Sequence, residues 1–432
     1  MKKLTIITII VLAFRVITAG TASADPIDSL KMLRSADITP IEIFLHLEYL
    51  ASDKLEGRFP GTEGDLLARQ HIADEFSEMG LTPAGDSGYF QFFTIREDLV
   101  PAATKRGPSL RTENVIGFLE GSDPVLKNEV IVIGAHFDHL GITSNYKMQD
   151  SPQEIHNGAD DNGSGTTGVM EIAEKIAANK DKFKRSFLFM CFSGEEEGLI
   201  GSAFFTKSEL FKKYNIVAMI NFDMIGRLSK NTLIINGTGT SPVWNNLVDE
   251  ANANYNFTIT KNPDGMGGSD QTSFTLKRVP ILFFFTGLHE DYHQPTDDFW
   301  KINTEGEAKV LNYAYDLTEK IANLDSKPEF SESAIVNKES TKNESFSSYV
   351  GTVPDFTSTD EGFKIAGVKS GSPGDKAGLK QGDLMIKFGD VTVKNIYDYT
   401  DALKKYKPGE TVDIVVMRDG QQVTVTCTLG KR

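Results

Sequence analysis

The sequence contains few cysteines, few histidines and fewer basic than acidic residues. Two of its 432 residues are cysteine, Cys191 within an apolar run and Cys427 near the carboxyl end, so we expect no disulfide between them. The formal net charge of −15 argues against a nucleic-acid partner, which would require a basic surface. Only seven histidines are present, so any clustering of histidine is informative.

The N-terminal segment has the pattern of an export signal. Met1-Lys2-Lys3 precedes the apolar residues 4–14, and Ala22-Ser23-Ala24 offers a cleavage site. Arg15 interrupts the apolar stretch, which argues against a membrane-spanning helix and leaves an uncleaved anchor as the alternative. We predict a signal peptide over residues 1–24 and a secreted or periplasmic chain with no stable membrane span after its removal.

Length and composition predict more than one folded domain. The hydrophobic fraction of 40% is sufficient for packed cores, and 432 residues exceed the usual size of one domain. Residues 325–348 are rich in Ser, Glu, Lys and Asn, which is typical of a linker. We therefore predict a large domain over residues 25–324 and a small one over residues 349–432.

Several potential metal ligands follow apolar runs of the large domain. Four runs, each typical of a buried strand, lead directly or through a short loop to these side chains: His136, Glu195 and Glu196, Asp223, and His293. Open α/β sheets bind their ligands at the carboxyl ends of strands. Each segment alone also fits an ordinary acidic turn, so the argument depends on their number and order.

A fifth segment is the acidic, glycine-rich turn of residues 158–165, which contains Asp161 and precedes apolar residues at helical spacing. Alone, it would be explained as a turn and helix N-cap. Four of the seven histidines nevertheless lie in two of the five segments: His136, His139, His289 and His293. We expect His46 and His71, on predicted N-terminal helices, to be structural.

In this order the motifs resemble the aminopeptidase Y type of di-zinc exopeptidase, of metallopeptidase clan MH. They are His-x-Asp, Asp-Asp-Asn-x-Ser-Gly, Glu-Glu-x-Gly-Leu-x-Gly-Ser, Asn-Phe-Asp-Met and Tyr-His, and the match extends from Ile41 to about Leu324. It includes the N-terminal Leu55-Glu56-Gly57-Arg58. The resemblance implies an α/β fold with a mixed, mostly parallel central sheet flanked by helices.

The resemblance also implies roles for individual residues around two Zn²⁺ ions. Asp161 would bridge the ions, and the remaining ligands would be His136 and Asp223 at one ion and Glu196 and His293 at the other. Glu195 would be the general base, Tyr292 the donor to the oxyanion, and Asp138 a supporting residue. The chain departs from many relatives at Gly268-Ser269-Asp270-Gln271, where they have Ser-Asp-His, so a contact to substrate is expected to differ.

We interpret the large domain as an aminopeptidase that removes N-terminal residues from peptides. Carboxylates around the ions suit the free α-amine of a substrate. A carboxypeptidase instead needs a cation to bind the terminal carboxylate, and Arg227 is the nearest candidate. A carboxypeptidase or dipeptidase, a glutaminyl cyclase, and an inactive peptide-binding protein are the alternatives. The last is disfavoured because binding alone requires no general base.

In the small domain, Ala377-Gly378-Leu379 is followed by Gly382-Asp383, and residues 411–417 and 422–429 are predicted to pair as a hairpin across Asp419-Gly420. The first of these motifs resembles that of a PDZ domain of the protease-associated kind. The resemblance implies a small β-barrel-like domain and assigns a peptide carboxylate to the loop Tyr349, Val350, Gly351 and Thr352. Such a domain can bind a chain end by strand addition. A rigid appendage without a ligand is the alternative.

Overall fold

The computed structural model describes residues 26–95, 110–142, 154–332, 348–354, 362–368, 371–394, 398–399, 402–403 and 405–431. The predicted signal peptide lies outside the described residues. Within them, no helix combines the length and apolar character needed to cross a bilayer. The chain divides into two compact units, Met1–Ile335 and Val336–Arg432.

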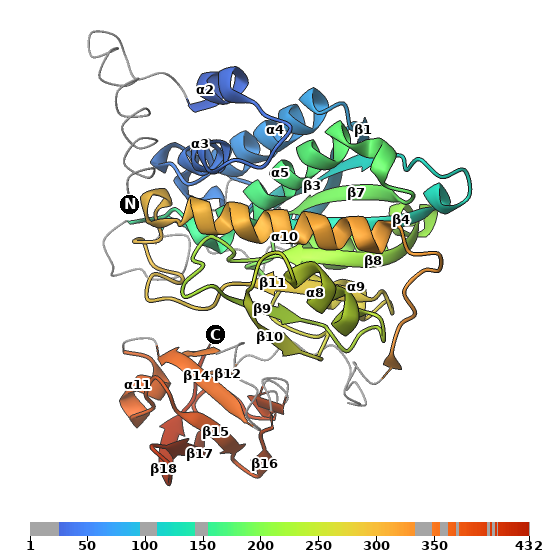
Figure 1. Cartoon of the computed structure of the whole chain (residues 1–432). Coiled ribbons are helices and arrows are strands. Elements are labelled where there is room, and N and C mark those ends of the chain that lie inside the picture. The colour runs from blue at the N-terminus through green and yellow to red at the C-terminus, as the bar shows by residue number, and fades with distance from the viewer. Residues whose placement is uncertain are drawn as a thin grey trace. The chain divides into compact units, whose positions relative to one another are not determined.

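The first unit is built on a nine-stranded sheet (Figure 1). In spatial order its strands are β1 (Thr82–Pro83), β3 (Leu110–Leu119), β7 (Ser186–Phe192), β4 (Glu129–His136), β8 (Asn215–Phe222), β11 (Ile281–Phe285), β9 (Thr232–Asn236) and β10 (Thr258–Asn262), with β2 (Phe90–Ile95) beside β3. The four central strands β7, β4, β8 and β11 are parallel, whereas β3 and β9 join them antiparallel. The predicted mixed sheet is confirmed.

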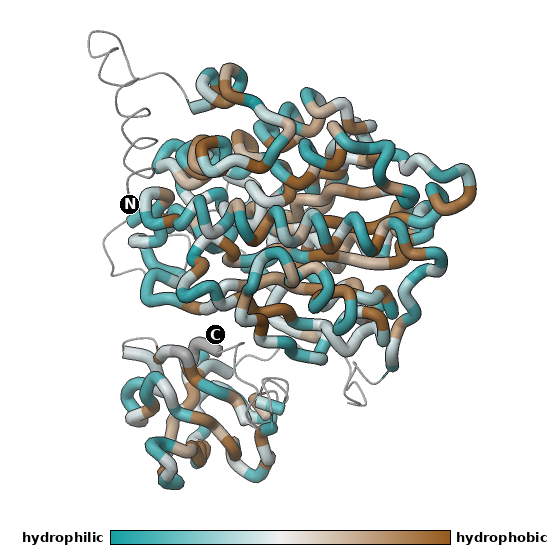
Figure 2. The backbone as a smooth tube through the Cα atoms, in the orientation of Figure 1, coloured by the Kyte–Doolittle hydropathy of each residue, from teal (hydrophilic) through white to brown (hydrophobic). Residues whose placement is uncertain are grey.

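Helices cover both faces of this sheet. One face packs against α3 (Pro40–Leu50), α4 (Glu63–Glu78), α5 (Gly165–Ala178), α8 (Trp244–Asn252) and α10 (Thr304–Ala322), and the other against α6 (Ile200–Lys207), α7 (Glu209–Lys213) and α9 (Gln271–Thr275). Along β4, Ile131 and Ile133 face the first set while Val130 and Val132 face the second. Strands buried on both faces are mostly apolar, in keeping with the brown and pale colours of the central strands in Figure 2.

Short elements complete the first unit. They are α2 (Pro26–Leu33), the two-stranded pair β5 (Gly141–Ile142) and β6 (Ile155–His156), and the short helical turns η1 (Asp53–Arg58), η4 (Leu126–Asn128), η6 (Ala159–Ser164), η7 (Lys180–Lys182) and η8 (Phe299–Lys301). The turn η6 leads directly into α5, the helix that packs on β4 and β7. The predicted acidic turn therefore lies beside the carboxyl ends of the central strands.

The second unit is an antiparallel sheet of β13 (Thr352–Pro354), β14 (Phe363–Val368), β15 (Leu384–Phe388), β17 (Thr411–Arg418) and β18 (Gln421–Thr428), with β16 (Val391–Thr392) beside β15. The pair β12 (Ser348–Tyr349) and β19 (Gly430–Lys431) and helix α11 (Pro373–Ala377) accompany it. Asp419 and Gly420 join β17 to β18 with positive φ angles of 49° and 75°, as a tight hairpin turn requires. The predicted hairpin is confirmed.

The ends of the predicted linker belong to folded structure. Ser331 N–H donates to Thr240 O at 2.8 Å and Glu332 pairs with Arg278, so residues 331 and 332 are bonded to the rest of the first unit. At the other end Ser348 is already in β12, paired with Lys431. A composition rule for linkers does not detect such contacts, because they join polar residues to partners far away in the sequence. Both cysteines are free and buried.

Candidate metal and catalytic centre

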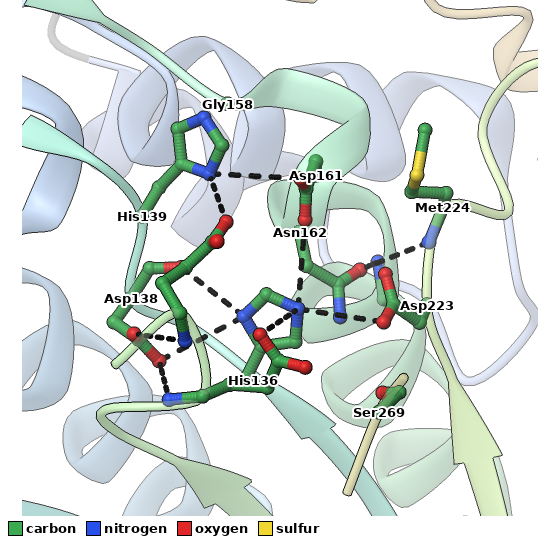
Figure 3. A network of polar contacts seen from close by, with 12 residues as sticks. His136, Asp138, His139, Gly158, Asp161, Asn162, Asp223, Met224 and Ser269 are labelled. Atoms are coloured by element: carbon green, nitrogen blue, oxygen red, sulfur yellow. Dashed lines mark hydrogen bonds and ion pairs between the residues drawn. The ribbon is translucent and has the colours of Figure 1, made fainter. Parts of the chain in front are cut away.

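The side chains predicted as metal ligands converge at the carboxyl edge of the four parallel strands. His136 is the last residue of β4 and Asp223 directly follows β8, while Asp161 is in the turn before α5. Glu196 follows β7 in a loop, and His293 lies in the loop after β11. Parallel strands place their carboxyl ends together, so the fold gathers residues that are 157 positions apart at most. Figure 3 shows His136, Asp161 and Asp223 directed toward one another.

The ligand atoms form two groups that share Asp161. In the first half-site, His136 Nε2 lies 3.5 Å from Asp161 Oδ1 and 3.5 Å from Asp223 Oδ2. In the second half-site, His293 Nε2 lies 3.1 Å from Asp161 Oδ2 and 3.3 Å from Glu196 Oε2. The two oxygens of one carboxylate therefore face two separate sets of imidazole and carboxylate.

These separations fit zinc. Zinc bonds to nitrogen and oxygen measure about 2.0–2.2 Å, so neighbouring ligand atoms of a tetrahedral ion lie roughly 3.3–3.5 Å apart. Three of the four distances of the half-sites match this spacing, and the fourth, 3.1 Å from His293 to Asp161, is slightly shorter. Imidazole with carboxylate is a donor set that zinc accepts. Glu195 Oε2, 4.0 Å from His136 Nε2, and His139 are further potential ligands nearby.

The centre has an excess of negative charge. Burial opposes the charged form of His136, but the carboxylates of Glu195 and Asp223 outweigh it and raise the pKa of this imidazole. At His293 burial is likewise outweighed, chiefly by Glu196, and the pKa is raised to about 10. Carboxylates crowded in this way stabilise whatever positive charge is placed among them. The electrostatics therefore favour cation binding.

Glu195 and Asp138 are linked through the backbone. Asp138 accepts a hydrogen bond from Glu195 N at 3.1 Å on one oxygen and from Glu196 N at 3.3 Å on the other. One buried carboxylate thus holds the peptide that carries both glutamates. Burial, opposed by His136, raises the pKa of Glu195 well above its usual value. A carboxylate with a raised pKa is a better proton acceptor near neutral pH.

Tyr292 lies beside the second half-site. Its ring stacks on His293 with a centroid separation of 3.9 Å. Burial, together with the charges of Asp161 and Glu196, raises the pKa of the Tyr292 phenol well above its usual value. The phenol consequently keeps its proton and remains a hydrogen-bond donor.

The structure also contains supporting residues that the sequence pattern did not identify. Asp297 accepts hydrogen bonds from Asp160 N at 2.9 Å and Asp161 N at 3.1 Å, and pairs with Arg227 at 3.0 Å. Asp160 pairs with His289 at 3.0 Å. Asp297 follows His293 by four positions, but nothing in the spacing distinguishes it from its neighbours.

Arg58 is a buried cation that joins the N-terminal segment to two ligand loops. Its guanidinium donates to Phe137 O, Asn157 O and Gly158 O at 2.7–2.8 Å, and to Leu50 O. Burial lowers its pKa to about 10. Arg58 belongs to the motif Leu55-Glu56-Gly57-Arg58 of the family resemblance. The carbonyl groups that Arg58 contacts could not be predicted from the sequence.

Comparisons with known proteins match two segments of the chain to known families. Residues 114–318 match the model of Peptidase family M28, and residues 353–429 match that of the PDZ domain. The chain carries a peptidase family M28 domain. All five predicted ligands lie within this M28 domain. The resemblance to clan MH and to a PDZ domain is therefore confirmed.

Relatives of the M28 domain include aminopeptidases. Leucine aminopeptidase 2 of Trichophyton rubrum is 30% identical over 185 residues, which cover 41% of this chain and 34% of that protein. The chain thus spans about a third of the length of the curated relatives that it matches first.

Solved structures share the fold of the M28 domain. The zinc aminopeptidase BSAP from Bacillus subtilis has a TM-score of 0.53 at 17% identity, covering 69% of this chain and 99% of that chain. A glutaminyl cyclase from Bacteroides thetaiotaomicron has a TM-score of 0.52 at 17% identity, covering 67% and 99%. At these identities the similarity shows the fold alone, so the site must decide the reaction.

Proposed function

We propose that the M28 domain is a zinc-dependent aminopeptidase that holds two Zn²⁺ ions. The observation that carries the proposal is the position of Asp161, whose oxygens face two half-sites with zinc-like ligand spacing. His136 and Asp223 would complete one site, and Glu196 and His293 the other. When bound, such ions lower the pKa of a shared water and stabilise negative charge on substrate oxygens.

The residues around the half-sites supply proton transfer and hydrogen bonding. Glu195 would accept a proton from the attacking water and donate it to the leaving amine, which is general base and then general acid catalysis. Tyr292 would donate a hydrogen bond to the carbonyl oxygen as negative charge develops there. Asp138 holds the Glu195 backbone, so the base keeps its position while it changes protonation.

The charges around the site favour a substrate with a free amine. Arg227 was the candidate cation for a peptide carboxylate, but its Nη2 pairs with Asp291 at 3.3 Å and Asp297 at 3.0 Å. A guanidinium already paired with two carboxylates is a weak anchor for a third. The surplus carboxylates near the half-sites suit an α-ammonium group instead.

The test compares peptides with free and acetylated N-termini in one assay, with bound zinc quantified. An aminopeptidase releases the first residue from the free peptide only, and two zinc ions should accompany full activity. Equal cleavage of both peptides would overturn the assignment. A substrate with N-terminal glutamine separates the cyclase alternative, because cyclisation releases ammonia and leaves the peptide bonds intact.

We also propose that the PDZ domain binds the carboxyl end of a peptide at Tyr349, Val350, Gly351 and Thr352. Gly351 has φ of +88°, a conformation that L side chains rarely adopt, and Val350 anchors the loop in the core. Among the described residues, β13 pairs with β14 on one side only, so its other edge suits strand addition.

Removal of the PDZ domain tests whether the two units work separately. A chain ending at Ile335 should hydrolyse aminoacyl substrates at near wild-type rate, while KM for long peptides rises because only these can reach both sites. We choose Ile335 rather than Leu324 because residues 331 and 332 contact the first unit. Loss of activity on the smallest substrates would show that the PDZ domain completes the active site.

We propose export through cleavage of residues 1–24, which is supported by the positive start and the apolar stretch of that segment. The N-terminal sequence of the protein recovered outside the cytoplasm tests this. A mature chain beginning at Asp25 is expected. Recovery of the protein only in the membrane fraction, with Met1 retained, would favour the uncleaved anchor.

A further inference from the structure

His139 is a buried histidine beside the centre that has no role in the proposed reaction. It lies three residues beyond His136 and is fully buried. Its Nδ1 is 2.8 Å from Glu196 Oε1, and its ring is 5.8 Å from that of His293. Figure 3 shows the His139 side chain beside Asp161. Its Nε2 has no hydrogen-bond partner among the described residues.

The distances distinguish His139 from the two predicted histidine ligands. His136 Nε2 lies 3.5 Å from both of its carboxylate neighbours and His293 Nε2 lies 3.1 Å and 3.3 Å from its own, at or close to the spacing of atoms bound to one zinc ion. A separation of 2.8 Å is instead the length of a charge-assisted hydrogen bond. Because an ionised carboxylate can only accept, Nδ1 of His139 is the donor and Glu196 Oε1 the acceptor.

The His139 ring is held in place by the backbone of a second ligand loop. A Cβ at Gly158 would lie 2.5 Å from His139 Cγ and Cδ2, so the ring is in close contact with this glycine. Gly158 O and Phe137 O both accept from Arg58, at 2.8 Å and 2.7 Å. The backbone that packs against the imidazole is therefore itself held by Arg58, which favours the ring orientation directed at Glu196.

We propose that His139 is a positioning residue that orients Glu196 for the second half-site. By occupying Oε1, it leaves Oε2 as the oxygen that faces His293, at 3.3 Å. Glu196 lies in a loop, whereas Asp223 of the first half-site directly follows a central strand, so Glu196 has more need of side-chain support. This inference rests on the proposed two-zinc function.

The test measures both zinc dissociation constants by titrating zinc-free protein against a chromogenic chelator. His139→Phe keeps a ring against Gly158 but removes the donor, and we expect one zinc ion to bind about 10–100-fold more weakly while the other is unchanged. His139→Asn should restore most of the affinity, because its amide N–H can replace that of Nδ1. His46→Leu, which removes an equally buried imidazole from α3, is the matched control and should bind both ions normally.

Each outcome supports or overturns the inference. Thermal unfolding of the zinc-free proteins checks that the variants fold, and His139→Leu repeats the comparison if the larger Phe side chain does not fit. Unchanged affinity for both ions in His139→Phe, or no recovery in His139→Asn, overturns the inference and leaves the proposed function intact. A wild-type chain that binds fewer than two zinc ions overturns the proposed function, and the inference with it.

Discussion

The two half-sites of the M28 domain differ in how their ligands are held. The His136 side chain is 1% exposed and ends a central strand, whereas that of His293 is 29% exposed and lies in a loop. Sheet hydrogen bonds therefore position the first half-site. The second half-site is positioned by side-chain hydrogen bonds, because Asp138 and His139 both bond to Glu196 in its loop. A sheet edge can thus provide half of the candidate centre, while the other half depends on residues that hold its loops.

The largest effect is expected from Glu195→Gln, which separates catalysis from metal binding. The amide matches the carboxylate in shape but cannot accept the proton of the attacking water. We predict a loss of about 10²–10⁴-fold in kcat, with zinc bound at both half-sites as in the wild type. Steady-state kinetics and zinc analysis of the same preparation measure both quantities.

Glu197, two positions beyond Glu195, provides a matched control for this change. Glu197→Gln makes the same substitution two positions along the loop and should leave kcat near the wild-type value. A Glu195→Gln variant that retains half of wild-type kcat would remove Glu195 from the reaction. Loss of one zinc ion in that variant would mean that Glu195 belongs to the first half-site as a ligand.

Asp161→Asn tests whether the two half-sites share one ligand. A neutral amide binds two cations more weakly than a bridging carboxylate, so both zinc affinities should fall. The decrease should exceed the roughly 10–100-fold cost of losing a supporting hydrogen bond. If the variant holds two zinc ions with wild-type affinity, Asp161 is not the bridge and Asp160 is the next residue to change.

A smaller effect is expected from partial metal removal, which compares the half-sites without a mutation. Because His293 is more exposed than His136, a chelator should remove zinc in two steps, with the second half-site losing its ion first. Residual zinc at increasing chelator concentration measures the steps. In His293→Asn the easily removed ion should be missing and the tightly held one retained. A single step in the wild type would contradict the difference between the half-sites.

The sequence predicted the parts of the centre that follow strands. Apolar runs located β4, β7, β8 and β11, and their order placed His136 and Asp223 at one edge of the sheet. The family resemblance supplied the ligand roles, which remain predictions. His139 and Asp297 could not be assigned in advance, because a buried histidine or aspartate gains its role from partners in other loops. The second half-site consequently depends more on tertiary contacts than the pattern suggests.

The four carbonyl groups that accept hydrogen bonds from Arg58 have a consequence for folding. Arg58 precedes Phe137 by 79 residues and Gly158 by 100, so these bonds form only after distant parts of the chain have come together. Until then the ligand loops lack their common support, and buried carbonyl groups without partners would oppose their closure. The centre should thus mature late in folding, after the sheet. Under the proposed function, the domain would thus be inactive while its own unfolded chain is most easily digested.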